Sequence, residues 1–520
     1  MSLSLSATSR RLDAFAGRWT MYRLTVFLLL AMTAWSFVLS FTGQLFYTPA
    51  ELAATAATAV VSALVASRVM GLLFRTRPQT DSSLITGLLL YFLFWPTTEG
   101  SQLLTVALAA GAATASKYLL VWRGRHIFNP AAFGAAALAL TGLNSAVWWV
   151  AAPLMLVVVL PAAALILYRN RLLPMASVFL LASGIIIVTR FLTGGESPVT
   201  ALATLFGSYP VLFFAGFMLS EPLTLPPRRN QRLLEAAVVG ILFAVPLNLG
   251  PVYMSPELAL LIGNLLAFAL APRAAIRLRL RENRALTPTA RELVFEPLHP
   301  LRFRPGQYVE LSLPHSTPDS RGTRRIFSLT TAPENPETVA VGLRATEPVS
   351  SFKSALLKLK PGAIISGTTA AGDFLLPRNP GVPLLLVASG VGITPFMSQL
   401  RSLAAGGNLH TSAGGSPAGT PARDVVLVYA ASSVDELAYA AELHGRGIRV
   451  LVCTPTDPQI SGWTWLGPGL PDAQALAREV PDVARRAAYV SGSPSAVAAA
   501  RTAVRGAGGR SIRTDAFLGY

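Results

Sequence analysis

The 520-residue sequence contains a single cysteine, Cys453, and only five histidines. One thiol cannot form a disulfide within the chain, and it cannot hold an iron–sulfur cluster, which needs several thiolates. The neighbouring residues "IRVLVCTP" indicate a strand, so we interpret Cys453 as a small buried residue. His126 is the only histidine before residue 299, and it lies between an arginine-rich turn and an apolar segment. The sequence therefore lacks the paired transmembrane histidines of a b-type haem site, and we interpret His126 as a helix-end residue.

Charged residues are also scarce, at 13% of the chain, and acidic residues are the fewest. The net charge of +17 would suit nucleic-acid binding if the excess lay in a soluble domain. Residues 1–281 hold 20 Lys and Arg against 8 Asp and Glu, whereas the remainder holds 23 against 18. Most of the excess thus falls in an apolar half, where short cytoplasmic loops collect Lys and Arg. We predict no nucleic-acid partner.

The first half of the chain consists of long apolar stretches. Many of these approach the ~20 residues that span a bilayer. With a cytoplasmic N-terminus, nineteen of the twenty Lys and Arg residues fall on the cytoplasmic side, and only Arg190 falls near the outer side. We therefore expect a multi-pass protein of the cell (inner) membrane, in contact with the lipid bilayer, whose N-terminal tail and C-terminal half are cytoplasmic. The ten predicted segments are 24–43, 50–73, 84–96, 101–121, 131–142, 147–167, 174–192, 200–219, 232–249 and 256–271.

Two features of these segments indicate an internal organisation. Segments 84–96 and 131–142 are too short for a full span. Broken helices are tolerated at membrane depth where they line an enclosed site. The fifth segment, with "FNPAAFGAAALAL", resembles the tenth, with "SPELALLIGNLLAFAL", and the two would enter the membrane from opposite sides. We predict a five-plus-five inverted repeat, with any ligand near the repeat interface.

The second half has the composition of a soluble protein. Alternating residues and turn formers predict a β-barrel of short strands over 273–378. From Val382 the order strand, glycine turn, helix in "VPLLLVASGVGITPF" predicts a parallel α/β domain over 379–520. The Gly/Ser/Pro-rich segment 404–423 predicts a flexible surface loop. The predicted domains are thus a cytoplasmic tail (1–23), a transmembrane helical domain (24–272), a β-barrel (273–378) and an α/β domain (379–520).

Two motifs in the barrel region carry candidate binding residues. In "RRIFSLT", the guanidinium of Arg325 can bind a phosphate through its fork of donors. The following Phe327 and Ser328 suit a strand edge against a flat ring. In "PVSSFKSALLKLKPG", the hydroxyls of Ser350 and Ser351 and the backbone N–H groups at a helix start suit a phosphate.

Three motifs follow in the α/β region. In "ASGVGITPF", Gly390 and Gly392 separate an apolar strand from a helix, so the backbone can approach a pyrophosphate closely. The segment "YVSGSPSAV" repeats the order of strand, turn and helix. The segment "TDAFLGY" offers an aromatic side chain that can lie over a ring.

The order of these motifs closely resembles the ferredoxin–NADP⁺ reductase superfamily over residues 275–520. The resemblance implies an FAD-binding barrel followed by an NAD(P)-binding domain. It implies that FAD is held by Arg325, Ile326, Phe327, Ser328, Ser350 and Ser351, and the nicotinamide nucleotide by Gly390, Gly392, Thr394, Pro395 and Gly492.

The sequence departs from that superfamily at two places. Many members have Cys-Gly-Pro where this chain has Ser-Gly-Ser at 491–493, so the candidate catalytic group beside the hydride path is the Ser491 hydroxyl. Either Phe517 or Tyr520 would cover the flavin, and the sequence does not choose between them. No arginine follows Tyr429 or Cys453, although a 2′-phosphate normally requires such a cation. We therefore expect NADH in preference to NADPH.

The first half resembles a second family. The motifs "DSSLITGLLL", "GRHIFNPAAFG", "FMLSEPLTLPP" and "SPELALLIGNLL" are together similar to the NqrB/RnfD family, which provides a membrane component of the Na⁺-translocating NADH:quinone reductase and of the Rnf complex, over residues 20–272. Those ten-span proteins carry flavin across the membrane, one FMN being attached to a threonine in a Ser-Gly-Ala-Thr motif that this chain lacks. The resemblance implies a non-covalent FMN or riboflavin near Asn129, Asp81 and Glu221. Each of these residues also lies at an apparent helix end, so capping and interfacial charge are the alternative roles.

The sequence thus predicts a membrane-bound NAD(P)H-dependent flavoprotein. A hydride would pass from the nicotinamide to FAD, and single electrons would pass on to a quinone, a second flavin, an external carrier or a partner redox subunit. We predict no haem, no iron–sulfur cluster and no metal site. One alternative is a transporter or channel whose flavin domain only senses redox state. Another is a soluble-type reductase that is merely anchored in the membrane.

Overall fold

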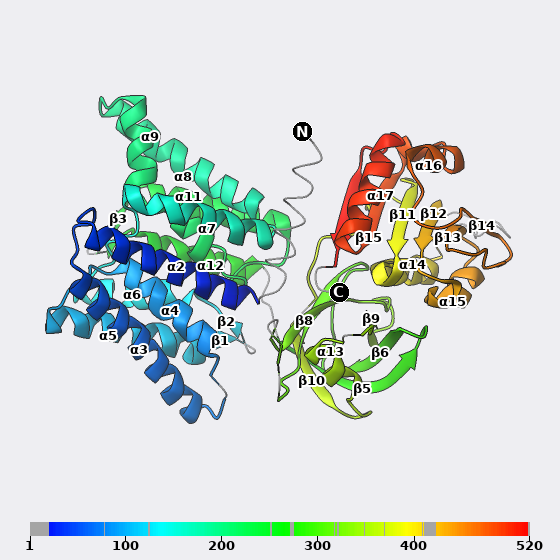
Figure 1. The fold of residues 1–520 in the computed structure, drawn as a ribbon, viewed down its shortest axis with the longest axis horizontal. Helices are drawn as coiled ribbons and strands as arrows, with labels where there is room; N and C mark the ends of the chain where they lie inside the picture. Colours follow the sequence, from blue (N-terminus) through cyan, green and yellow to red (C-terminus); the bar gives the residue numbers. More distant parts are fainter. Residues whose placement is uncertain are drawn as a thin grey trace. The chain divides into compact units, whose positions relative to one another are not determined.

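The computed structural model describes residues 20–517 apart from 77, 123–124, 250–251, 271–274, 317, 320–321, 348, 369, 408 and 410–422. The chain divides into two compact units, Met1–Ala274 and Ala275–Tyr520, called here the helical unit and the two-domain unit (Figure 1). Most of the predicted N-terminal tail, most of the predicted surface loop and the candidate residue Tyr520 lie outside the described residues.

Helices build the helical unit, and each of the ten predicted apolar segments overlaps a helix. Local capping explains several of the starts: Thr48 and Glu51 form a capping box at the helix that begins at Pro49, and the Asn129 side chain caps the helix that begins at Pro130. The helices are α2 (Met21–Phe41), α3 (Pro49–Leu73), α4 (Thr80–Leu93), α5 (Gly100–Leu119), α6 (Pro130–Thr141), α7 (Leu156–Arg169), α8 (Leu173–Thr193), α9 (Pro198–Gly207), α10 (Val211–Phe213) with the π-helical turn Phe214–Met218, α11 (Arg229–Ala244) and α12 (Pro256–Leu270).

Fewer of these helices than predicted are long and apolar enough to cross a membrane alone. Among the described residues only α2, α3 and α8 meet both conditions. The pair formed by α9 and Val211–Met218, bent by 51°, would make a fourth span if it counts as one. Helices α4, α6, α7 and α12 are apolar but shorter, as was expected for two of them. By length and composition, three or four spans are therefore possible among the described residues, and the expected ten spans are not shown.

The helical unit has the same packing order in its two halves. Helix α3 packs against α4 and α5, and α5 packs against α6; in the second half α8 packs against α9 and α11, and α11 against α12. A two-stranded hairpin precedes the last helix of each half, β1 (Val121–Trp122) with β2 (Arg125–His126) and β3 (Asn248–Leu249) with β4 (Val252–Tyr253). Glycines allow some of this close packing: a Cβ on Gly87 would lie 2.6 Å from the Val60 Cα, and one on Gly240 would lie 2.9 Å from the Phe179 carbonyl oxygen.

The first part of the two-domain unit is an antiparallel barrel, as predicted. Its strand order is β8-β7-β10-β5-β6-β9, and a bridge between Leu329 and Val341 joins the two outer strands. Leu293, Phe295, Val309 and Leu311 lie in its core. The strands are β5 (Ala275–Ala285), β6 (Ala290–Pro297), β7 (Tyr308–Ser312), β8 (Arg324–Ser328), β9 (Val339–Arg344) and β10 (Ile364–Thr368), with helix α13 (Ser351–Leu357) before β10.

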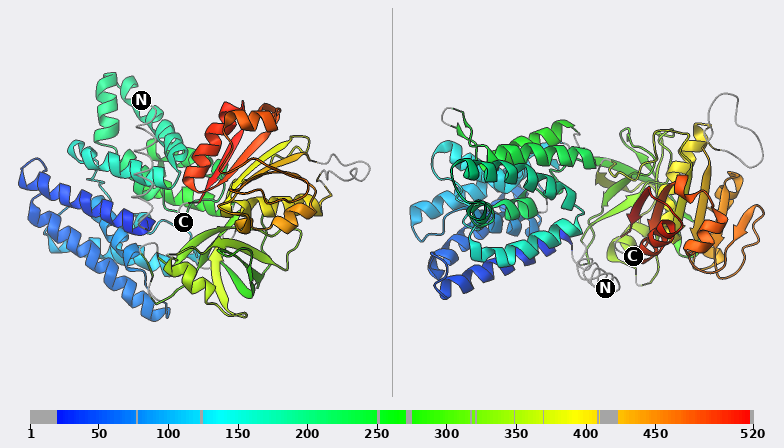
Figure 2. Two further views of the ribbon diagram at one scale, coloured as in Figure 1. Left: turned by 45° about the vertical axis from the view of Figure 1, so that its right-hand side comes forward. Right: turned by 90° about the horizontal axis from the view of Figure 1, so that it is seen from above.

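The second part is a parallel α/β sheet, also as predicted, in the order β14-β13-β12-β11-β15-β16. Alternate residues of β11 pack on opposite faces, where α14 and α15 cover one side and α16 and α17 the other (Figures 1 and 2). Cys453 is buried at the end of β13, as expected, and burial raises its thiol pKa to about 12. The elements are β11 (Leu384–Ser389), α14 (Thr394–Ala405), β12 (Val425–Ala430), α15 (Ala440–Gly445), β13 (Arg449–Cys453), β14 (Trp463–Trp465), α16 (Ala473–Glu479), β15 (Ala487–Gly492), α17 (Pro494–Gly506) and β16 (Ile512–Ala516).

Candidate active site

The strand order of the α/β sheet locates its ligand crevice. The chain runs outward from β11 through β12 to β13 on one side, and then returns to add β15 and β16 on the other. Ligands of open parallel sheets bind at the carboxyl ends of the strands where this order reverses. Here that place lies between β11 and β15, which are hydrogen-bonded neighbours. The two predicted glycine turns follow these two strands.

The two turns touch each other. A Cβ on Gly392 would overlap the carbonyl oxygen of Ser491, and one on Gly492 would lie 2.9 Å from the Ser389 Cβ. Gly492 also has a φ of +152°, and Gly390 has a φ of +52° with open space where a side chain would stand. Glycine is therefore required at all three positions, by close approach or by backbone conformation. The open space at Gly390, in the turn ahead of Thr394 and Pro395, fits a bound dinucleotide.

Ser491 lies in β15 beside Ala388 of β11 and Asp515 of β16. Its side chain is 1% exposed, and its hydroxyl has no hydrogen-bond partner in the described part of the chain. A buried hydroxyl without a partner carries a free-energy cost, which a hydrogen bond to a bound nicotinamide would offset. The Phe517 backbone N–H donates to the Gly492 carbonyl at 2.9 Å, so the chain returns to this turn after β16.

Arg325 lies in a small polar cluster on the barrel. Its guanidinium donates to an Asp319 carboxylate oxygen at 2.8 Å and to the Gly322 carbonyl at 3.1 Å. The Ser351 hydroxyl accepts from the Asp319 backbone N–H at 2.8 Å and lies 3.0 Å from the His315 Nε2. The structure therefore brings together Arg325 and Ser351, which the sequence placed in separate motifs, through Asp319. Neither Asp319 nor His315 was predicted, because the loop that carries them follows no recognisable pattern.

The remaining predicted FAD residues lie on both sides of β8 and at the start of α13. The rings of Phe327 and Phe352 stack at 6.0 Å between centroids, and Ser328 is buried. Ile326 points the opposite way and is 61% exposed, as strand alternation requires. Ser350 caps α13 by accepting from the Lys353 backbone N–H at 3.4 Å. A cation held beside aromatic rings and hydroxyls fits a flavin nucleotide with its phosphates.

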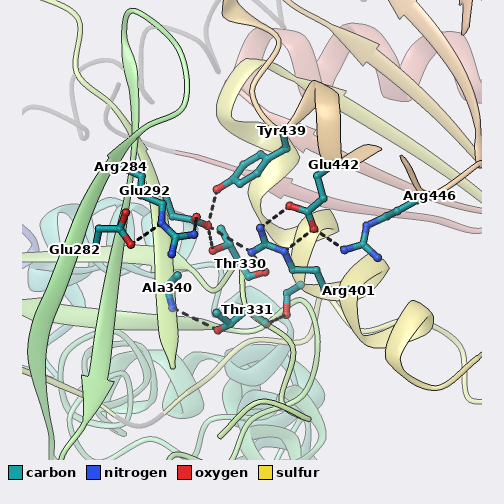
Figure 3. A network of polar contacts seen from close by, with 11 residues as sticks. Glu282, Arg284, Glu292, Thr330, Thr331, Ala340, Arg401, Tyr439, Glu442 and Arg446 are labelled. Atoms are coloured by element: carbon teal, nitrogen blue, oxygen red, sulfur yellow. Dashed lines mark hydrogen bonds and ion pairs between the residues drawn. The ribbon is translucent and has the colours of Figure 1, made fainter. Parts of the chain in front are cut away.

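The sequence interpretation missed a network of charged residues between the barrel and the α/β domain (Figure 3). Glu292 on β6 is 3% exposed, and it accepts from the Tyr439 hydroxyl at 3.0 Å and the Arg401 guanidinium at 3.4 Å. Burial and the Glu292 charge raise the pKa of Tyr439 well above its ordinary value, so its hydroxyl stays a donor. No motif marks these residues, because the face of β6 that bears Glu292 is covered only when the second domain packs on it.

In the helical unit, Asn129 has several structural contacts. Its side-chain oxygen accepts from the Ala132 backbone N–H at 3.1 Å, and its side-chain nitrogen donates to the Met218 carbonyl at 3.1 Å. Its backbone N–H donates to the side chain of Asn264 on α12 at 2.8 Å. These contacts describe the capping alternative, and they also join the last helices of the two halves. A role for Asn129 at a flavin stays a prediction.

Asp81 and Glu221 face different partners. Asp81 faces Arg23 on α2 at 3.7 Å, and a Glu221 carboxylate oxygen lies 3.9 Å from the His126 Nε2. His126 lies in the hairpin strand β2 between α5 and α6, so its expected position at a helix end is wrong. Between them is Lys117 on α5, whose ammonium donates to Ser82 and, at 2.7 Å, to the Thr86 hydroxyl, and which interacts electrostatically with Glu221. The sequence identified Lys117 only as an inner-side cation.

Glu221 also lines a small pocket with a cavity volume of about 20 Å³. The pocket is bounded by α2, α4, α7 and the π-helical turn, so both halves of the helical unit contribute. Neither Asn129 nor Asp81 lines it. The lining residues are Met21, Tyr22, Thr25, Ile85, Ile166, Gly216, Phe217, Ser220, Glu221 and Pro222.

Comparison with known proteins gives relatives for about half of the chain, and no family model matches it. The chain is 26% identical over 208 residues to the ferredoxin reductase component of 3-ketosteroid-9-alpha-monooxygenase from Mycolicibacterium smegmatis, which covers 40% of this chain and 53% of that protein. It is 36% identical over 137 residues to ferredoxin–NADP reductase B from Sorangium cellulosum, covering 25% of this chain and 54% of that protein. It is 31% identical over 139 residues to a flavohemoprotein from Oceanobacillus iheyensis, covering 26% and 31%.

The chain spans about half the length, or less, of these curated relatives. The ferredoxin reductase-type module that these relatives share agrees with the barrel, with the parallel sheet and with the glycine turns at the switch point of that sheet. The chain therefore contains a ferredoxin reductase-type FAD/NAD(P)-binding module, the module of NAD(P)H-dependent oxidoreductases.

Proposed function

We propose that the protein is a membrane-bound oxidoreductase that passes electrons from NAD(P)H through FAD to an acceptor in or across the membrane. The observation that carries this proposal is the contact between the two glycine turns at the switch point, with the Ser491 hydroxyl beside them, which has no hydrogen-bond partner among the described residues. When bound, FAD would accept a hydride from the nicotinamide and release its electrons singly.

The chain's own residues bind and orient the reactants. Arg325, held by Asp319, offers its guanidinium to the phosphates of the flavin nucleotide. Gly390 and Gly392 let the backbone approach the pyrophosphate of the nicotinamide nucleotide. The Ser491 hydroxyl positions the nicotinamide ring. Phe517, the aromatic residue of the described C-terminal segment, is hydrogen-bonded through its backbone to the same turn. The protein thus supplies position and electrostatics.

The preferred nucleotide is NADH. After β12 the chain continues with Ser432, Ser433 and Asp435, and after β13 with Thr454 and Asp457. An acidic residue near the ribose favours its 2′-hydroxyl, whereas a 2′-phosphate needs a nearby arginine. These residues support NADH and disfavour NADPH.

The helical unit resides in the cell (inner) membrane. The large apolar side chains at its surface support this: Leu30, Val65, Leu104, Leu160 and Ile185 are exposed, with many others on the same unit. Among the described residues of the two-domain unit only Ile326, Ile364 and Trp465 are large, apolar and exposed. A soluble protein rarely exposes so much apolar surface on one part of the molecule. The short helices α4, α6, α7 and α12 would lie at membrane depth within the helical unit, completing the ten segments.

The acceptor site lies at the interface of an inverted repeat. The equivalent packing order of the two halves, and the hairpin before α6 and before α12, support the repeat. Repeat interfaces near the membrane midplane are where such folds bind ligands. We place the quinone or non-covalent flavin between the two halves of the helical unit, and the small pocket near Glu221, between α2, α4, α7 and the π-helical turn, would be the cytoplasmic end of that site. The resemblance of this half to flavin-carrying membrane proteins supports the same assignment.

The deciding experiment uses the full chain purified in detergent. Its flavin is extracted, identified and counted, and NADH oxidation is followed with a short-chain quinone as acceptor. FAD together with quinone-dependent NADH oxidation is the expected result. A second, non-covalent flavin in equal amount would assign the site in the helical unit to that flavin. Protein that takes up no FAD after supplementation would overturn the proposal.

The bent helix pair and the repeat also support a second function, a transporter with a redox-sensing flavin domain. The two functions differ in a measurable way. A transporter reconstituted in vesicles moves its solute without NADH, whereas an electron-transfer enzyme consumes NADH without moving solute.

A further inference from the structure

The network in Figure 3 joins the strand that carries the flavin motif to the helix that carries the nucleotide turn. Thr330 follows the end of β8 by two residues, and its hydroxyl donates to a Glu292 oxygen at 2.7 Å. Arg401 lies on α14, which begins at Thr394 directly after the glycine turn. The Arg401 guanidinium donates to the Thr330 carbonyl at 2.8 Å. One arginine therefore touches the flavin-binding strand from the nucleotide-binding helix.

A two-pronged contact holds Arg401 in place. Its Nε and Nη2 donate to the two Glu442 oxygens at 2.8 and 2.6 Å. Glu442 also accepts from Arg446, and the Arg401 guanidinium lies 5.3 Å from the centre of the Tyr439 ring. Such bidentate pairs fix orientation as well as distance. The guanidinium thus has one defined direction, toward Glu292 and Thr330.

Two further close contacts join the barrel to α14 at the same interface. The Ser398 hydroxyl on α14 donates to the Thr331 carbonyl at 2.6 Å. A Cβ on Gly342 of β9 would lie 2.5 Å from the Thr394 Cγ2, so the barrel strand touches the first residue of α14. Any loosening of the network therefore moves the helix start at which the nucleotide is expected.

Hydride transfer is sensitive to such a movement. It requires the reacting atoms at about 3–3.5 Å, and a misplacement of about 1 Å costs roughly 10²-fold in rate. We propose that Arg401 and Glu292 are positioning residues for hydride transfer: their ion pair across the domain interface sets the distance between flavin and nicotinamide. This inference rests on the proposed function of the two-domain unit.

The test compares Arg401→Met with Arg486→Met in the full-length protein. Arg486 is a matched control because it is equally an arginine between two carboxylates, Asp424 at 2.6 Å and Asp482 at 2.8 Å, but both lie within the α/β domain. Flavin reduction by NADH is followed by stopped flow, with NADH and with NADH deuterated at the transferred position. FAD content and the NADH concentration for half-maximal rate are measured for each variant.

We expect Arg401→Met to keep its FAD and to lower the limiting rate of flavin reduction by at least about tenfold, with an altered isotope effect. Arg401→Lys keeps the charge but loses the bidentate geometry of the guanidinium, so its limiting rate should lie between those of the wild type and Arg401→Met. Arg486→Met should lower thermal stability and leave the limiting rate near that of the wild type. If Arg401→Met does not fold, Tyr439→Phe, which removes one donor to Glu292, should still lower the limiting rate severalfold.

The possible outcomes distinguish a failure of the proposed function from a failure of this inference alone. If NADH does not reduce the flavin of the wild-type protein, both the proposed function and this inference are overturned. A wild type that is reduced normally, with unchanged rate and isotope effect in Arg401→Met or, failing that variant, in Tyr439→Phe, would overturn this inference alone. An equal loss of rate in Arg486→Met would also overturn it, because general destabilisation would then explain the effect.

Discussion

Gly392 and Ser491, almost a hundred residues apart, lie so close that a side chain on the first would overlap the backbone carbonyl of the second. The contact joins the turn after β11 to the end of β15, the two strands between which the sheet order reverses. The contact brings two turns that are far apart in the sequence into one crevice. The chemistry of the two-domain unit depends on the shape of this crevice.

Gly392→Ala should therefore impair nucleotide binding. The added methyl group must displace the Ser491 carbonyl and the Gly492 Cα, and overpacking of this kind costs about 1–3 kcal/mol. We expect FAD to be retained and the NADH concentration for half-maximal flavin reduction to rise at least severalfold. Gly445→Ala is the control, since its Cβ meets nothing within 4 Å. Unchanged NADH kinetics in Gly392→Ala would contradict the assignment of this turn.

Ser491→Ala should separate catalysis from stability. The hydroxyl has no hydrogen-bond partner among the described residues, so its removal should leave the thermal midpoint unchanged or slightly raised. If the hydroxyl hydrogen-bonds the nicotinamide, the loss of about 0.5–1.5 kcal/mol corresponds to roughly a 2- to 13-fold lower rate of flavin reduction. Stopped-flow kinetics and a thermal melt of the same sample test both halves. A large drop in stability with an unchanged rate would assign Ser491 to structure alone.

Arg325→Ala should weaken FAD binding. A charge-assisted hydrogen bond to phosphate contributes about 1.5–3 kcal/mol, so we expect the FAD dissociation constant to rise roughly 10- to 100-fold. The neighbouring Arg324→Ala is the control, because the Arg324 side chain is exposed and lies on the same strand. Fluorescence titration of the FAD-depleted protein measures both. Equal effects of the two substitutions would indicate a general charge effect and no specific contact.

The sequence predicted the elements well where the signal is local. Runs of apolar residues and the caps at Thr48 and Asn129 determine where helices begin, and "VASGVGITP" carries strand, turn and helix within ten residues. It predicted the shortness of α4 and α6, but it did not predict that α7 and α12 are also too short to span a membrane alone. Nor does any pattern in the chain join Arg325 to Ser351, since Asp319 links them only in the folded barrel.

Buried charges were the least predictable feature. In "ARELVFEP", Leu293 and Phe295 face the barrel core, and strand alternation turns Glu292 the other way, toward expected solvent. The α/β domain covers that face, and its partners Arg401 and Tyr439 lie more than a hundred residues further along the chain. The link between Asn129 and Asn264 is hidden for the same reason, being a contact between the two halves of the helical unit.

Asn129→Ala tests which of its two roles is real. Loss of the cap and of the hydrogen bond to Met218 should lower stability by about 1 kcal/mol or more, seen as a lower thermal midpoint in detergent. Asn129→Ser keeps a capping hydroxyl oxygen and loses the amide donor without adding a charge, so it should be milder. A structural role predicts unchanged flavin content in both variants. Loss of a second flavin from folded Asn129→Ala protein would instead assign the residue to a cofactor.

Glu442 makes the domain interface sensitive to acid. Burial alone would raise its pKa, but hydrogen bonds from Arg401 and Arg446 outweigh that effect and lower the pKa below the ordinary value of 4.5. The ion pairs therefore stabilise the fold fully above about pH 4.5, and this stabilisation is lost as the pH falls through the lowered value. Thermal melts of the wild type and Glu442→Gln, from about pH 6 downward, should converge in acid because the variant has no carboxylate to protonate. A constant difference in thermal midpoint between the two proteins across that range would show that protonation of Glu442 does not contribute to the loss of stability in acid.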